Sequence, residues 1–90
     1  MLYALICTDK THHIQTRKAN RDAHLAYIEA TGVVTMAGPL LDGAGEMSGS
    51  LVILDVADLA AAETWASNDP YAKAGLFSDV RIEAWKKVIG

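Results

Sequence analysis

The hydrophobic positions form short runs separated by polar segments, and the spacing within each run predicts strand or helix. Residues 2–7 are an apolar run of strand length, and residues 8–16 are polar and predict a loop. From residue 17 to residue 31 the apolar side chains recur with helical spacing, and Gly32 then supplies a helix stop. The first third of the chain therefore predicts a strand followed by a helix.

The middle of the chain predicts two strands joined by a hairpin loop. Residues 33–41 begin with strand-forming side chains, and Gly38 and Pro39 predict that this second strand ends there. Residues 42–46 contain two glycines and an aspartate, and we expect a flexible hairpin loop there. Residues 48–56 are apolar at their centre and predict the third strand.

The last third predicts a second helix and a fourth strand. Asp58 is a plausible N-cap for a helix that contains Trp65 and must end before Pro70, because the residue before a proline avoids helical geometry. Residues 78–89 alternate between apolar and polar side chains, which is typical of a strand. The order β-α-β-β-α-β predicts an α+β, ferredoxin-like fold, with both helices on one face of a four-stranded antiparallel sheet.

The first and third predicted strands are apolar on both faces, as residues 2–7 and 51–54 show. Two helices on one side leave the other face uncovered, and soluble monomers rarely expose an apolar patch of that size. We therefore expect a homodimer in which the same face of a second copy covers the patch and completes a barrel-like core. The alternative is a curled sheet whose own loops cover this face.

The composition is that of a single folded domain. Ninety residues make one domain, and 51% hydrophobic against 21% charged residues exclude a disordered chain. Eight basic and eleven acidic side chains give a net charge of −3, so we expect neither nucleic acid nor an anionic membrane surface as a partner. A single cysteine excludes an internal disulfide.

Targeting and cofactor signals are absent from the sequence. No apolar run approaches the roughly 20 residues of a membrane span, and the first residues lack the features of a signal peptide, so we expect a soluble cytoplasmic protein. No glycine-rich phosphate loop precedes a helix, and no histidine–cysteine cluster has the spacing of metal ligands. We therefore expect neither a cofactor nor a metal.

The three histidines differ in their surroundings. His12 and His13 lie in a polar segment and are expected to be solvated. His24 lies within the predicted helix, on the flank of its apolar stripe, where an imidazole can be partly desolvated and still reach a pocket. Such a histidine can act as an acid or a base near neutral pH. The alternative is a boundary histidine that is hydrogen-bonded to a backbone carbonyl.

Asp69 allows two interpretations. It can be the N-cap of a short helical turn, with Pro70 at the first helical position and Gly75 as the stop. It can also accept the Nδ1 proton of a histidine and fix the tautomer of that ring. The two roles are compatible, because a carboxylate has several acceptor positions. Sequence spacing alone does not place Asp69 beside His24.

Several short motifs occur in a fixed order along the chain, and together they resemble those of the YciI-like (YCII-related) family. They lie at residues 1–3, 21–25, 37–40, 48–50, 69–75 and 85–88. The resemblance covers essentially the whole length. It implies a ferredoxin-like domain that dimerises into an α/β barrel.

The resemblance also implies an enzyme with a histidine–aspartate pair in a cleft. At the matching positions the pair is His24 and Asp69. Other motif positions become candidates for substrate binding, namely Arg21, Gly38, Pro39, Ser48, Tyr71 and Gly75.

Two functional hypotheses follow. In the first, His24, held by Asp69, moves a proton on a small cyclic or aromatic substrate in an elimination, isomerisation or hydrolysis that needs no cofactor. Nearby arginines would hold an anionic group of that substrate. In the second, the domain binds a small ligand or a partner without catalysis, and the two side chains only complete a buried polar network.

Overall fold

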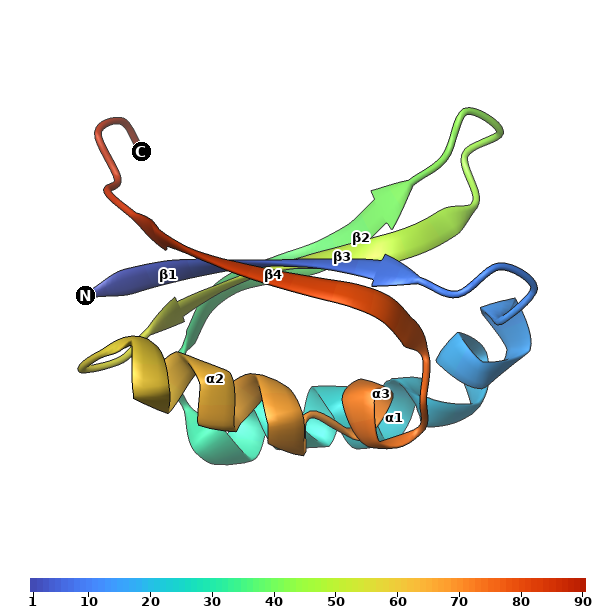
Figure 1. Ribbon diagram of the computed structural model, residues 1–90, viewed down its shortest axis with the longest axis horizontal. Coiled ribbons are helices and arrows are strands. Elements are labelled where there is room, and N and C mark those ends of the chain that lie inside the picture. The colour runs from blue at the N-terminus through green and yellow to red at the C-terminus, as the bar shows by residue number, and fades with distance from the viewer.

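The computed structural model describes residues 1–90 and contains the predicted elements, including the short helical turn that Asp69 was expected to cap (Figure 1). The elements are β1 (Leu2–Asp9), α1 (Ile14–Thr31), β2 (Val34–Leu41), β3 (Met47–Asp55), α2 (Leu59–Asn68), α3 (Pro70–Lys73) and β4 (Phe77–Trp85). No helix has both the length and the apolar character that crossing a membrane requires.

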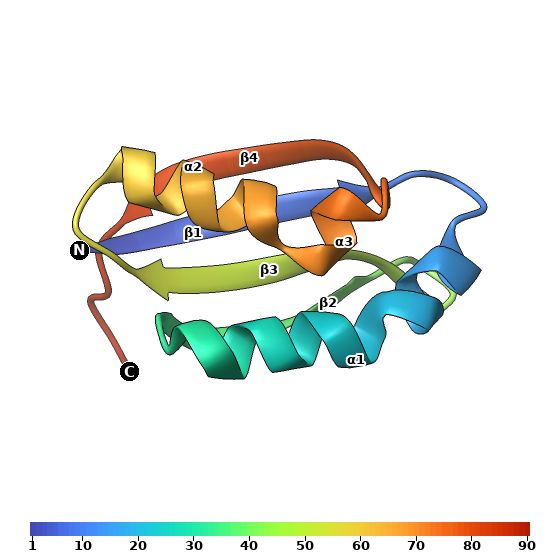
Figure 2. The ribbon, with the colours of Figure 1, turned by 90° about the horizontal axis from the view of Figure 1, so that it is seen from below.

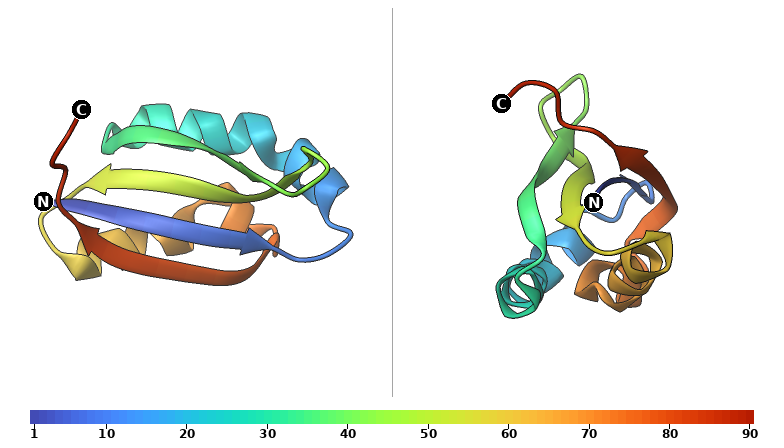
Figure 3. Two further views of the ribbon diagram at one scale, coloured as in Figure 1. Left: turned by 90° about the horizontal axis from the view of Figure 1, so that it is seen from above. Right: turned by 90° about the vertical axis from the view of Figure 1, so that its left-hand side faces the viewer.

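The four strands form one antiparallel sheet in the order β2-β3-β1-β4. All three helices lie on the same face of this sheet (Figures 1 and 2). Seen from its end, the domain has α1 on the β2 side and α2 on the β4 side (Figure 3). This arrangement confirms the α+β, ferredoxin-like βαββαβ fold predicted from the sequence.

Helix ends follow the predicted capping signals. Asp58 accepts a hydrogen bond from the backbone N–H of Ala61 at 2.8 Å and caps α2, which ends at Asn68, before Pro70. Gly32 ends α1 with φ = 66°, a left-handed conformation that glycine adopts without strain.

Two predicted boundaries near β1 were wrong. The predicted loop at residues 8–16 is shorter, because β1 continues to Asp9 and α1 already begins at Ile14. Thr8 still pairs with strands on both sides, so backbone pairing extends β1 past its apolar run. Conversely, β4 ends at Trp85, where it pairs with Leu2 at the start of β1, and residues 86–89 have no strand left to pair with.

The predicted end of the second strand at Gly38 and Pro39 was also wrong. β2 continues through both residues to Leu41, with Pro39 opposite Ser50 of β3. Because β2 is an edge strand, it tolerates a residue without a backbone N–H.

The face of the sheet that the helices cover carries the hydrophobic core. Alternate residues of β1 and β3 point toward the helices and pack with two residues of α2; the buried cluster is Tyr3, Leu5, Cys7, Val52, Leu54, Ala62 and Trp65. Burial of this apolar surface supplies the main stabilising free energy of the domain.

The opposite face is also apolar, as the sequence predicted. By strand register, Met36 of β2 lies beside Ile53 of β3 on this face. Leu51 lies two residues before Ile53 in β3 and therefore points to the same face. Met36 is 52% exposed and Leu51 is 38% exposed. The homodimer that would cover them stays a prediction.

Candidate active site

His24 is one of two buried residues of α1, and the other is Arg17. Seven positions separate them, which is close to two helical turns, so both side chains point inward from the same side of the helix. The inward face of the helix is not the predicted apolar stripe. Leu25 of that stripe is 42% exposed, whereas His24 is only 6% exposed. His24 therefore lies at the centre of the inward face and not on its flank.

The burial of His24 is offset by a specific partner. Its Nδ1 lies 2.7 Å from Oδ1 of Asp69, 45 positions away in the chain. A buried polar group needs such a partner to compensate for lost hydration. The alternative of a histidine bonded to a backbone carbonyl is wrong, since Nδ1 contacts this carboxylate.

Asp69 performs both of the roles that its sequence position allowed. It lies between α2 and α3 in an extended conformation, and its Oδ1 accepts the backbone N–H of Tyr71 at 3.0 Å, which caps α3. Pro70 occupies the first helical turn. The same oxygen meets His24, so the local capping motif also holds the carboxylate in position for the imidazole.

The proton of the imidazole can be assigned from this contact. An ionised carboxylate only accepts hydrogen bonds, so Nδ1 of His24 carries the proton that Asp69 accepts. Nε2 has no hydrogen-bond partner in the protein. No side-chain nitrogen or oxygen atom that is fully shielded from solvent lacks a partner, so Nε2 cannot be fully shielded. Nε2 is therefore the end of the ring that reaches solvent.

Tyr71 fixes the plane of the imidazole. The rings of His24 and Tyr71 stack with their centres 4.0 Å apart and their planes at 15°. Phe77 meets the Tyr71 ring edge-on at 6.1 Å. Burial, together with the charge of Asp69, raises the pKa of the Tyr71 hydroxyl, although nearby arginines act in the opposite direction. Tyr71 is consequently a neutral phenol at physiological pH.

Arg17, which is not among the predicted site residues, forms a buried network beside the histidine–aspartate pair. Its Nε and Nη2 donate to the two carboxylate oxygens of Asp9 at 2.8 and 2.9 Å, and Nη2 also donates to Ser50 Oγ at 2.8 Å. Its Cζ lies 4.8 Å from the centre of the Tyr71 ring. Burial acts to lower the pKa of Arg17, but hydrogen bonding and the charge of Asp9 outweigh it and raise that pKa.

A cavity of about 240 Å³ lies between α1 and the strands β2 and β3. His24, Arg17 and Ser50 line it, and so does Tyr71. Four of the predicted substrate-binding residues belong to this wall, namely Arg21, Gly38, Pro39 and Tyr71. Asp69 is not part of the wall and supports His24 from behind.

Ser48 and Gly75 are not brought to this cavity. Ser48 lines a separate hollow beside the loop that joins β1 to α1, and its hydroxyl donates to the carbonyl of Leu40 at 3.4 Å. Gly75 has φ = 73° and follows α3, where a left-handed residue turns the chain toward β4. Their predicted contacts with substrate stay predictions.

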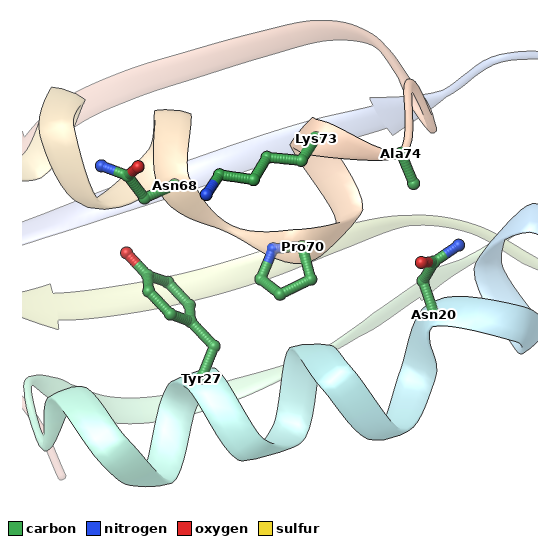
Figure 4. A pocket seen from close by; sticks show the side chains of 6 residues that line it. All are labelled: Asn20, Tyr27, Asn68, Pro70, Lys73 and Ala74. Atoms are coloured by element: carbon green, nitrogen blue, oxygen red, sulfur yellow. The ribbon is translucent and has the colours of Figure 1, made fainter.

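A wider, shallow groove of about 710 Å³ runs between α1 and the α2–α3 segment (Figure 4). Tyr27 projects toward it from α1, and Lys73 does so from α3 (Figure 4). Neither member of the His24–Asp69 pair lines this groove. The smaller cavity is less open than this groove and has the acid–base pair at its wall, and it is therefore the candidate active site. No cluster of three or more His, Cys, Asp and Glu side chains could hold a metal ion.

Known proteins share both the sequence and the fold. The chain is 37% identical to the protein YciI of Escherichia coli O6:H1 over 97 aligned positions, which cover 98% of this chain and 99% of the relative. A protein of Haemophilus influenzae is 34% identical over the same shares of each chain.

One solved structure has the same fold as this chain. It is the 5-chloro-2-hydroxyhydroquinone dehydrochlorinase of Burkholderia phenoliruptrix AC1100 in complex with 2,5-dihydroxybenzoquinone. It superposes with a TM-score of 0.88 at 33% identity, covering 96% of this chain and 94% of that one. The YCII-related domain model matches residues 1–86. The chain belongs to the YCII-related domain family.

Proposed function

We propose that this protein is a small-molecule enzyme in which His24 is the catalytic acid–base and Asp69 is its positioning residue. One observation carries the proposal: the 2.7 Å contact between His24 Nδ1 and Asp69 leaves Nε2 free at the wall of a cavity. A histidine oriented by a carboxylate is a recurrent arrangement for proton transfer.

In the proposed reaction, Nε2 of His24 takes a proton from a carbon of the substrate. The electron pair of that C–H bond forms a new double bond, and the leaving group departs with the electron pair of its own bond to carbon. Asp69 stabilises the imidazolium through Nδ1, and the π face of the stacked Tyr71 ring adds to this. The imidazolium then returns its proton to solvent or to the leaving group.

An elimination on a single-ring, oxygen-substituted compound fits best. The structurally similar Burkholderia protein is a dehydrochlorinase bound to 2,5-dihydroxybenzoquinone. The cavity here measures about 240 Å³, and an apolar cavity of about 150 Å³ already admits benzene. Isomerisation would begin with the same proton transfer, and in a hydrolysis His24 would instead take the proton of the attacking water.

The test combines binding and turnover. 2,5-Dihydroxybenzoquinone is titrated into the wild-type protein while the melting temperature is followed, and chloride release is measured with a chlorinated hydroxyhydroquinone. We expect ligand stabilisation and turnover in the wild type. In His24→Ala, turnover should fall about 10²–10⁴-fold, which is the usual contribution of acid–base catalysis.

His12→Asn is the matched control. His12 lies in the exposed β1–α1 loop with φ = 61°, a conformation that asparagine tolerates. It should bind and turn over like the wild type. Turnover that survives in His24→Ala would overturn the catalytic role. Ligand binding without any turnover would instead favour the non-catalytic binding domain.

The proposal also includes a homodimer through the sheet face that the helices leave open. Its support is the apolar character of this face, where Met36 and Leu51 are exposed. Sedimentation velocity should give a dimer for the wild type and a monomer for Leu51→Asp. Ala26→Asp, at an exposed position of α1 on the other side of the sheet, serves as the charged control and should remain a dimer. A wild-type monomer at all concentrations would contradict the dimer.

A further inference from the structure

Two arginines point toward the candidate cavity from successive turns of α1, and they differ in what compensates their charge. Arg17 is buried and gives two hydrogen bonds to Asp9 and a third to Ser50. Its positive charge is neutralised inside the protein. Arg21 also lines the cavity, but it is exposed and forms neither an ion pair nor a hydrogen bond. Arg21 therefore supplies the one uncompensated cation of the cavity wall.

The hydroxyl of Tyr71 is a second hydrogen-bond donor on the same wall. The residue is only 2% exposed, and Arg17 approaches the hydroxyl as a hydrogen-bond donor, but the hydroxyl gives its own proton to no group of the protein. No buried polar side-chain atom of the chain is both sealed from solvent and without a partner. The hydroxyl therefore opens into the cavity that the ring lines, where it can donate a hydrogen bond to a ligand.

We propose that the cavity selects a single-ring compound that carries an oxyanion, held between the guanidinium of Arg21 and the hydroxyl of Tyr71. This inference rests on the proposed function and names the class of substrate for the same site. A charged acceptor gains more from two such donors than a neutral one does, since charge-assisted hydrogen bonds are about twice as strong. Arg17 is the poorer candidate, because Asp9 neutralises its charge and Asp9 and Ser50 together take three of its five N–H groups.

The arrangement also gives the oxyanion a part in the chemistry. Negative charge accumulates on the substrate as His24 removes a proton, and conjugation through the ring carries that charge to the oxygen. Donors that are already in place at that oxygen stabilise the transition state more than the ground state. Tyr71 stacks on His24, so the donor and the base are held in a fixed relation.

The experiment compares ligands that differ only in charge. Isothermal titration measures the binding of 4-hydroxybenzoate, which is anionic, and of 4-hydroxybenzamide, which is neutral and of the same shape. 2,4-Dinitrophenol, ionised at neutral pH, distinguishes a phenolate from a carboxylate. We expect the wild type to bind at least one anion about tenfold or more tightly than the neutral amide.

Three variants assign the preference to its residues. Arg21→Gln should bind the anion and the amide about equally, and Tyr71→Phe, which keeps the stacked ring, should bind the anion more weakly. Lys18→Gln removes a positive charge from the exposed side of the same helix and should change nothing. Circular dichroism should show the same fold in all three variants.

Three other results would overturn the proposed preference for an anion. Equal affinity for the anion and the amide in the wild type, with both lost in His24→Ala, would overturn the charge preference and leave the proposed site standing. Equal weakening in Lys18→Gln and Arg21→Gln would overturn it as well, because the attraction would then be diffuse. Failure of all three ligands to bind would overturn this inference, and retained turnover in the chloride assay would then still support the proposed function.

Discussion

The helix-covered face of the sheet has two ends with different chemistry. At the end near Tyr3 and Leu54, the packing is apolar and centres on Trp65. At the other end lie all four of the buried polar residues of the chain, which are Arg17, His24, Ser50 and Asp69.

The apolar end therefore contributes most of the stability, and the polar end carries the groups that can act on a ligand. Trp65 at the apolar end needs only one polar contact, from its Nε1 to Thr31 Oγ1 at 2.9 Å, and otherwise packs against rings such as Tyr27. Every buried polar atom at the other end has a partner or reaches solvent. Burying four polar side chains in one place costs stability that an apolar core would not lose, and such local departures from simple packing are typical of functional sites.

Trp65→Ala should produce the largest effect and should act on the apolar end alone. Removal of a buried tryptophan leaves a cavity and costs about 3–5 kcal/mol of unfolding free energy. Urea denaturation measures this loss. Ligand binding at the His24 cavity should persist under conditions where the variant is folded, and a specific loss of binding there would contradict the separation of the two ends.

Arg17→Met should be the most costly change at the polar end. It leaves the carboxylate of Asp9 buried without a partner, and breaking a buried ion pair in this way costs about 3 kcal/mol or more. The double variant Arg17→Met with Asp9→Asn removes the orphaned charge and should recover a large part of that stability in urea denaturation. If the double variant were no more stable than the single one, the pair would not be the source of the loss.

The sequence predicted what depends on local signals. The order of helices and strands along the chain, the caps at Asp58 and Asp69 and the stop at Gly32 each depend on residues within or next to the element itself. The errors were of the same local kind. Polar Thr8 and Asp9 looked like a loop, although backbone pairing keeps both in β1.

The site required contacts that span the chain. The bond between His24 and Asp69 joins positions 45 apart, and only the family resemblance brought them together beforehand. The role of Arg17 could not be predicted, because a charged side chain is expected at the surface unless a partner is known, and its partner Asp9 lies in a segment whose polar residues predict a loop. The seven-residue spacing of Arg17 and His24 was the one available signal that they share a face.

Cys7 lies on the helix-covered face between the two ends and gives a test of moderate size. Burial, reinforced by the charge of Asp69, raises the pKa of its thiol from 9.0 to about 12. Between these values the unfolded chain loses the proton and the native state keeps it, so the stabilising contribution is complete below pH 9 and is lost as the pH rises toward 12.

The measurement is the difference in unfolding free energy between the wild type and Cys7→Ala. This difference cancels the other titrating groups, and it should shrink by roughly 1 kcal/mol per pH unit above pH 9. A difference that stays constant from pH 8 to pH 10.5 would show that the native thiol ionises like the unfolded one.

Asp69→Asn should have the smallest effect on stability and gives the sharpest test of the polar end. Asparagine is as good an N-cap as aspartate and has nearly the same volume, so the loss should be about 1 kcal/mol or less. One oxygen of Asp69 serves both the N–H of Tyr71 and the imidazole. In Asp69→Asn the amide oxygen must keep that position, because an NH₂ group there would place two hydrogen-bond donors against each other.

Nitrogen-15 spectra of the variant should therefore still show the neutral His24 ring protonated at Nδ1. Turnover should fall less than in His24→Ala, because only the negative charge beside the ring is lost. A ring protonated at Nε2 would mean that the capping bond does not hold the carboxylate for His24.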